Sequence, residues 1–350
     1  CEFTGYTNKS GYYQTDSCLN VSYCERVNVL NTYFHDTGYE LNDSMLNRAL
    51  TVDNGDLVEI NGCKFNKVNQ AIVTMNNKTI ITNCTFDYVE DNNVYNLRGE
   101  LIFTNNNVSN RNDEGVVTTG NVNVISNNIF DFVPHSIVIG ASMERLIVTN
   151  NVFQNVKTKT NKHGVVISAR SEEYKIDDLV FKNNTIDIPV QCDGNGQIMH
   201  FPIVTNLSFT DNIINFYAVG YGRGIYLKDV ETLIFTNNFM NDKNNRENAN
   251  AYVFGVAPRK QVITGNYLGC LRIIVNNAQN LEYVTTNMNP YLQTHNSNKI
   301  YTGTCAPVQG TWKRGDVIFN KFASAGGVLG WICVADGTPG TWKPMGTIQS

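Results

Sequence analysis

The chain has 350 residues, of which 42% are hydrophobic and 17% are charged, and its formal net charge is −4. This composition can supply a long apolar core, and it creates no basic field that would attract nucleic acid. No apolar run approaches the roughly 18 residues that a membrane-spanning helix needs. We therefore expect neither nucleic acid nor a membrane as a partner.

A short phrase repeats ten times between Ile60 and Met288. It consists of a β-branched or aromatic residue, a small polar residue, a turn-forming residue and then Cys or Asn. A weaker copy begins at Val29, and the ten copies begin at Ile60, Ile81, Phe103, Ile125, Val148, Phe181, Phe209, Phe235, Ile263 and Val284. The period is 21 to 33 residues. Such a repeat predicts a solenoid of stacked turns.

Apolar residues alternate with a period of two within each repeat, which predicts short strands, and three of them fit in each turn. The first strand covers segments such as 115–119, 136–140, 164–168 and 224–228. The second strand carries the first residue of the phrase, and the third strand follows its fourth residue. The third position is Gly, Asn or Asp in nine copies and Thr286 in the last, so the turn there is expected to need a positive φ.

The fourth position of the phrase is expected to form an internal column. It is Cys63 and Cys84 in the first two copies, and Asn at positions 106, 128, 151, 184, 212, 238, 266 and 287 in the others. Stacked amides can bond to one another and to the buried backbone of the turns. We interpret Cys63 and Cys84 as buried, reduced thiols, and a Cys18–Cys24 disulfide stays open as an alternative.

Over roughly Val29 to Met288 the chain resembles the right-handed parallel β-helix proteins with an internal asparagine ladder, the pectate-lyase-like superfamily. The resemblance implies an all-β fold: a single-stranded right-handed parallel β-helix with a small C-terminal β cap domain. We expect irregular first turns at 1–58 with upstream sequence missing, the helix at 59–298, and a cap or trimerisation domain at 299–350. Because the superfamily includes lyases, hydrolases and non-catalytic adhesins, the fold does not define the reaction.

All three Trp residues lie in the last fifty residues, at Trp312, Trp331 and Trp342. The segments TWKRGD, GWICV and TPGTWK are similar to C-terminal segments of bacteriophage tailspikes and tail fibres. This resemblance implies a parallel homotrimer in the virion tail, joined to the phage tail or baseplate through a missing N-terminal region, and folded in the host bacterial cytoplasm. Its partner would be a bacterial surface polysaccharide. The clustered Trp residues are expected to form the aromatic core of the cap or, alternatively, a sugar-stacking module.

Two faces of the solenoid are expected to have different roles. The first strand is apolar in both of its alternating columns, with Val117, Val138 and Val166 in the outer one, so we expect it to face the threefold axis. The third strand presents polar residues outward, which makes it the predicted substrate face. These residues are Asp87, Ser109, Asp131, Gln154, Asp187, Asn215 and Asn241.

Hydrolysis of a glycosidic bond needs two carboxyl groups. The catalytic candidates are Glu114, Asp131 and Asp187, with the two Asp residues two turns apart, about 10 Å at the strand spacing. Glu114 is expected to align with two imidazoles of the following turns. The candidate substrate-binding residues are His135, His163, Arg111, Tyr221, Arg223 and Asp193.

A second cluster competes for the site, at the corner between the first and second strands, where the 33-residue turn is expected to carry an insertion. It consists of Glu144, Arg170, Glu172, Glu173, Tyr174 and Asp177. No metal-ligand spacing is present, and we expect no metal and no cofactor. The expected reaction is endo-glycoside hydrolysis. The alternatives are β-elimination at a uronic acid, or receptor binding without catalysis.

Overall fold

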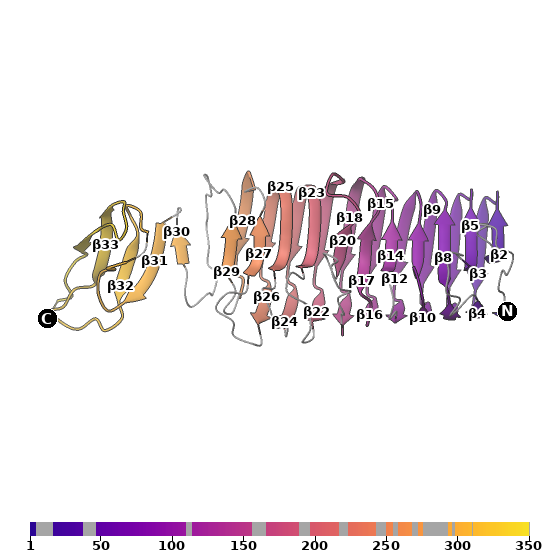
Figure 1. Cartoon of the computed structure of the whole chain (residues 1–350), viewed down its shortest axis with the longest axis horizontal. Helices are drawn as coiled ribbons and strands as arrows, with labels where there is room; N and C mark the ends of the chain where they lie inside the picture. Colours follow the sequence, from indigo (N-terminus) through magenta and orange to yellow (C-terminus); the bar gives the residue numbers. More distant parts are fainter. Residues whose placement is uncertain are drawn as a thin grey trace.

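The computed structural model describes residues 1–4, 17–37, 47–109, 114–155, 166–188, 197–216, 223–242, 250–254, 258–267, 272–275, 293–295, 298–309 and 311–349. These residues form strands without any helix, and therefore no helix among them could cross a bilayer. The strands stack into a long solenoid with three strands in each turn (Figure 1).

The first strand of each turn forms one parallel ladder. In ladder order it contains β2 (Ser17–Ser22), β5 (Arg48–Asp53), β8 (Gln70–Met75), β11 (Val94–Asn96), β14 (Glu114–Thr118), β17 (His135–Ile139), β20 (Ile167–Ala169), β23 (Gln197–Thr210), β25 (Arg223–Thr236), β27 (Asn250–Phe254) and β29 (Arg272–Val275).

The second strand of each turn forms the next ladder, which shares β23 and β25 with the first. The other members are β3 (Arg26–Leu30), β6 (Leu57–Asn61), β9 (Lys78–Thr82), β12 (Glu100–Thr104), β15 (Val122–Ser126), β18 (Met143–Thr149), β21 (Lys175–Lys182) and β28 (Lys260–Thr264). The strands β23 and β25 run through both positions, and therefore the two ladders form one 19-stranded sheet.

The third strand of each turn forms a separate ten-stranded parallel sheet. Its members are β1 (Glu2–Thr4), β4 (Tyr33–Thr37), β7 (Lys64–Val68), β10 (Thr85–Val89), β13 (Asn107–Ser109), β16 (Ile129–Asp131), β19 (Val152–Gln154), β22 (Thr185–Ile188), β24 (Ile213–Phe216) and β26 (Phe239–Asp242). The predicted right-handed parallel β-helix is therefore confirmed.

The turn between the second and third strands has the predicted backbone. The third position of the phrase has φ between 55° and 70° in all nine described copies, from Gly62 to Gly265. The last copy, which contains Thr286 and Asn287, lies outside the described residues.

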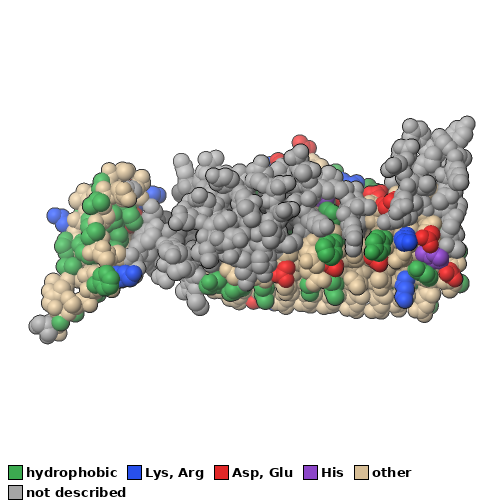
Figure 2. Space-filling view, turned by 60° about the horizontal axis from the view of Figure 1, so that its bottom comes forward, with side chains coloured by type: hydrophobic (Ala, Val, Ile, Leu, Met, Phe, Trp, Pro, Cys, Tyr) green, Lys and Arg blue, Asp and Glu red, His purple; other side chains and the backbone are tan. Residues whose placement is uncertain are grey.

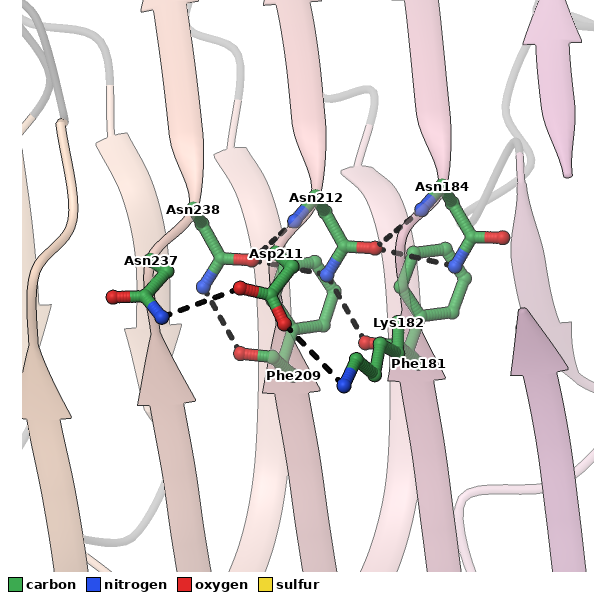
Figure 3. A network of polar contacts seen from close by, with 8 residues as sticks. All are labelled: Phe181, Lys182, Asn184, Phe209, Asp211, Asn212, Asn237 and Asn238. Atoms are coloured by element: carbon green, nitrogen blue, oxygen red, sulfur yellow. Dashed lines mark hydrogen bonds and ion pairs between the residues drawn. The ribbon is translucent and has the colours of Figure 1, made fainter. Parts of the chain in front are cut away.

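The asparagine column is continuous from Asn106 to Asn266, and Figure 3 shows three of its members. Asn212 is typical: its Nδ2 donates to Asn238 Oδ1 and to the carbonyl of Phe181, both at 3.0 Å. Its Oδ1 accepts from the backbone N–H of Asn184 at 2.9 Å. Each amide therefore satisfies buried polar groups in two neighbouring turns, as predicted.

Aromatic rings fill the core beside this column. Nine Phe side chains among the described residues are fully buried, and most neighbours along the row stack at about 5 Å; Phe181 and Phe209, for example, are 5.0 Å apart with an interplanar angle of 4°. Cys63 and Cys84 are buried free thiols, as predicted. The pKa of Cys84 is raised by its contact with the Cys63 thiol and by burial, which keeps it neutral. Cys18 and Cys24 are both free, so the alternative disulfide is absent.

The C-terminal segment forms a separate five-stranded sheet of β30 (Gln293–His295), β31 (Asn298–Gly303), β32 (Val317–Asn320), β33 (Gly330–Ala335) and β34 (Thr341–Pro344). Trp312 and Trp342 meet edge to face at 5.1 Å. Both indole N–H groups donate to backbone carbonyls three residues earlier in the chain. These two rings therefore contact each other, but both are only half-buried, and the buried apolar residues described in this sheet are Ile318 and Cys333.

Candidate active site

Between β8 and β25 the outer column of the first-strand ladder changes from mainly apolar to polar. In ladder order this part contains Val73, Tyr95, Val117, Val138, Ser168, His200 and Tyr226. Asn20 and Thr51 precede it in the column, and Val253 and Ile274 follow it. Val166 was predicted in this column, and that prediction is wrong: Val138 pairs with Ser168, and Val166 lies two residues earlier and is buried. Three consecutive apolar residues, 165–167, gave no indication of which of them points outward.

The first charged cluster on this face joins residues from three different turns. Arg170 Nη2 lies 2.8 Å from Glu114 Oε2, and its Nη1 donates to the Tyr95 hydroxyl at 3.0 Å. The guanidinium carbon also lies 5.2 Å from the centroid of the Tyr95 ring. Burial by itself would lower the pKa of Arg170, but the hydrogen bond and the charge of Glu114 raise it overall. Arg170 therefore stays charged beside the Glu114 carboxylate.

This cluster lies over the apolar part of the column. Arg170 follows β20 and Tyr95 belongs to β11, three turns earlier, so their backbones are about 14 Å apart along the axis. Val117 and Val138 occupy the two positions between them and are 0% and 1% exposed in the single chain. A neighbouring subunit is thus not needed to cover them. This face was expected on a threefold axis because its apolar column needed a neighbouring chain to cover it, and at these two positions that reason does not apply.

The second charged cluster lies on the same face, nearer to the C-terminus. Lys228 Nζ lies 3.0 Å from Glu172 Oε2, and it also donates to the Glu172 carbonyl at 3.2 Å. His200 Nε2 lies 3.9 Å from Glu172 Oε1. The His200 ring, which is largely buried, meets Tyr226 edge to face at 5.0 Å. An imidazole, a phenol, an ammonium and a carboxylate therefore converge at this point.

The two clusters form one candidate site, which we call the first-strand face and define as Tyr95, Glu114, Arg170, Glu172, His200, Tyr226 and Lys228. Glu114 begins β14 and Glu172 follows β20, two turns further along the axis. The strand spacing separates their backbones by about 10 Å along the axis. The Glu114 carboxylate pairs with Arg170, and the Glu172 carboxylate pairs with Lys228 of β25.

The third-strand face has the predicted column of carboxylates. Pairing of β16, β19 and β22 places Asp131 and Asp187 two turns apart in one column. Asp131 accepts a hydrogen bond from Asn155 Nδ2 at 2.7 Å, and Asp187 accepts one from Asn215 Nδ2 at 2.7 Å. Neighbouring amides thus hold both carboxylates, whereas Glu114 is paired with Arg170 on the other face.

The N-terminal end of the third-strand face contains an open hollow of about 610 Å³, lined by residues that include Tyr33, Lys64, Asn66 and Asp87. The Tyr33 ring stacks on His35 at 4.4 Å. Figure 2, which turns this side toward the reader, shows acidic side chains distributed along the solenoid among hydrophobic ones. An aromatic ring beside polar groups is chemically compatible with a sugar.

The predicted substrate-binding residues are only partly described. His135 pairs in register with Glu114, as expected, and is buried. Arg223 begins β25, where it pairs with Gln197. The other four lie outside the described residues: Arg111, His163, Tyr221 and Asp193.

The predicted corner cluster is divided in the structure. Arg170 and Glu172 belong to the first-strand face. Glu144 and Asp177 lie in the second ladder, where Glu144 accepts from Asn121 at 3.1 Å and Asp177 pairs with Lys175 at 2.7 Å. The hydrogen bond from Lys175 lowers the pKa of Asp177. Glu173 is exposed in the turn before β21, beside the half-buried Tyr174.

The insertion in the 33-residue turn lies elsewhere than predicted. The connection from β19 to β20 covers residues 155–166, compared with only 132–134 between β16 and β17. The connection from β20 to β21 covers 170–174, compared with 140–142 one turn earlier. Most of the extra length therefore precedes the first strand. No group of His, Cys, Asp and Glu that could hold a metal occurs in the described part of the chain.

The strand ladders and the asparagine column define a right-handed parallel β-helix. No family model and no curated protein matches the sequence. Among solved structures, the chain is similar to a mutant tailspike protein of E. coli bacteriophage HK620 in complex with a pentasaccharide, with a TM-score of 0.44 and 11% sequence identity. The similarity covers 69% of this chain and 47% of that one, so the chain spans about half of the length of that protein.

Proposed function

We propose that the chain belongs to a phage tailspike that binds a bacterial surface polysaccharide, capsule or O-antigen, and cleaves it by endo-glycoside hydrolysis on the first-strand face. The observation that carries the proposal is the placement of two carboxylates, Glu114 and Glu172, beside the Tyr95 and Tyr226 side chains on one face. Paired carboxylates are what glycoside hydrolysis needs, and aromatic rings bind the apolar faces of sugars. The Trp-containing C-terminal segments support the tailspike assignment.

Each glutamate has a role that follows from its partner. Glu114 is paired with the Arg170 guanidinium, and its proposed role is that of the general base that activates water. Glu172 pairs with the Lys228 ammonium. In the proposed complex a saccharide displaces this ammonium, and Glu172 is the general acid that protonates the leaving oxygen. The two groups then act on opposite sides of the scissile bond.

A second reaction, β-elimination at a uronic acid, is favoured by one specific feature of the same face. Arg170 and Lys228 are cations that can neutralise a uronate carboxylate, and His200 and Tyr226 are groups that can act as bases. Incubation with host polysaccharide separates the possibilities. Shortened chains without the ultraviolet absorbance of an unsaturated uronate indicate hydrolysis, shortened chains with that absorbance indicate elimination, and unshortened chains indicate a receptor-binding protein.

Substitutions test the proposed residues. Glu114→Gln and Glu172→Gln keep the shape of the side chain but abolish proton transfer, so each should lower the cleavage rate at least about 100-fold, with binding and melting temperature retained. Glu173→Gln, one residue further along the same turn, is the matched control and should keep wild-type activity. If Asp131→Asn abolishes cleavage while both glutamate variants stay active, the site is on the third-strand face instead.

The proposal extends to assembly and location. We propose a homotrimer in the virion tail that attaches to the phage tail or baseplate through sequence upstream of the described turns. Cysteines in the chain are free wherever they are described, which is compatible with folding in the host cytoplasm before release. In this proposal the tailspike carries both the surface that binds the polysaccharide and the surface that cleaves it.

A further inference from the structure

The second-strand ladder presents an apolar column outward between mostly polar ones. Its inner column includes the buried Phe103 and Val148. From Ile80 onward the central outward column has one partly exposed apolar side chain per turn, with Ser208 as the exception, and the two earlier positions are Asn28 and Glu59. We call this column the second-strand stripe: Ile80, Ile102, Val124, Ile147, Val180, Ser208, Ile234 and Val262. A continuous row of partly exposed apolar side chains is a surface that a partner protein can bury.

A second apolar column starts on the other side of the asparagine turn, at the first outward position of the third strand. We call it the third-strand stripe: Ile129, Val152, Thr185, Ile213, Phe239 and Tyr267. Ile213 is 46% exposed and Phe239 is 40% exposed. The Phe239 and Tyr267 rings stack at 4.7 Å. Figure 2 shows hydrophobic side chains recurring along this side of the solenoid.

The two stripes therefore flank one edge of the solenoid, and their spacing restricts what can cover them. Each stripe presents one side chain per strand spacing of about 4.8 Å, and the second-strand stripe continues for about 34 Å. Only a surface with the same linear repeat can fill every position, and a second copy of this chain has that repeat. Around Ser208 the second-strand stripe contains an open hollow of about 420 Å³, which leaves room for a partner side chain.

The charges along the edge fit self-association. The Lys78–Glu100 pair (3.1 Å) and the Arg145–Asp178 pair (3.2 Å) border the second-strand stripe. Positive and negative groups alternate there, so two copies can approach without net repulsion. Stripes of roughly 34 Å and 24 Å in length and about 10 Å in width give each copy on the order of 600 Å² of contact surface, divided between its two neighbours.

We infer that copies of this chain associate along this edge, with the second-strand stripe of one copy packed against the third-strand stripe of the next. Two unlike stripes on one edge make a head-to-tail interface, which closes into a ring around an axis along the solenoid. This inference rests on the proposed homotrimer for the number of copies and moves its contact surface away from the first-strand face. It does not depend on the proposed reaction.

Lysine substitutions test both stripes. Val180→Lys and Ile213→Lys place a charge in the centre of each stripe, and Leu30→Lys is the matched control, because Leu30 is 54% exposed in β3, outside both stripes. Light scattering after size-exclusion chromatography and native mass spectrometry measure the number of copies. We expect a wild-type oligomer, an unchanged oligomer for Leu30→Lys, and dissociation to monomers for both stripe variants, with the β-sheet circular dichroism retained.

Several results would overturn the inference. These are a monomeric wild type, oligomers that persist in both stripe variants, and dissociation by one stripe variant alone, which excludes contact between unlike stripes. If a lysine variant does not fold, Val180→Ser and Ile213→Ser replace it, and a higher dissociation concentration is then the expected result. Cleavage of polysaccharide is measured separately on the intact Glu114→Gln and Glu172→Gln oligomers, so failure of the assembly and failure of the proposed reaction are distinguished.

Discussion

The asparagine column can be tested at Asn151, which lies in its middle and is 1% exposed. Its Nδ2 donates to the carbonyl of Ile125 at 2.9 Å and to Asn184 Oδ1 at 3.1 Å. Its Oδ1 accepts from the backbone N–H of Asn128 at 2.9 Å and from Asn128 Nδ2 at 3.0 Å. Asn151→Leu keeps a similar volume and removes all four hydrogen bonds.

The expected loss of stability follows from the groups left behind. The carbonyl of Ile125 and the backbone N–H of Asn128 lose the partner that the Asn151 amide provided, whereas Asn184 Oδ1 and Asn128 Nδ2 each keep another one. At about 1 to 3 kcal/mol for each unsatisfied buried group, the variant should lose about 2 to 6 kcal/mol in its free energy of unfolding.

Urea denaturation followed by circular dichroism measures this difference. Asn107→Leu is the matched control, because Asn107 begins β13 with an exposed side chain, and a surface substitution should change stability by no more than about 0.5 kcal/mol. If Asn151→Leu loses no more stability than this control, the hydrogen bonds of the column do not stabilise the turns and our account of the ladder is refuted.

Two further predictions concern the first turns and the glycines. The pKa of His35 is raised, mainly by its hydrogen bond to Asp36 and also by Glu2, so His35 stabilises the fold fully below its ordinary pKa, and this contribution is lost as the pH rises through the raised value. Asp36→Asn should lower the pKa of His35 in an NMR titration, and an unmoved pKa contradicts the assignment. Gly99→Ala should destabilise the chain by more than the roughly 1 to 2 kcal/mol of a left-handed alanine, because its Cβ would also collide with the backbone of the preceding turn. Gly326→Ala has a similar φ with open space around it and should show the smaller loss in thermal unfolding.

The repeated phrase made the solenoid, its turn and its internal column predictable, because four consecutive residues specify both the turn conformation and the position of the buried amide. A residue type that tolerates positive φ, followed by a buried amide, specifies the same local structure wherever it occurs. The second-strand stripe was readable in the same way: the residue before each copy of the phrase, such as Ile102 or Ile147, has its register fixed by the phrase itself. The first strand was instead the predicted contact surface between subunits.

The candidate site depended on contacts that only the folded chain makes. Glu114 and Arg170 are 56 residues apart, and their ion pair requires the exact number of residues in each intervening turn. Insertions of uneven length precede the first strand, and apolar alternation alone does not determine the register across them. For this reason Val166 was assigned to the wrong column, and His200 and Lys228 were not predicted as site residues. The turn residue and the buried amide of each repeat determined the β-helix, whereas the tertiary register of the strands decided which side chains meet on its surface.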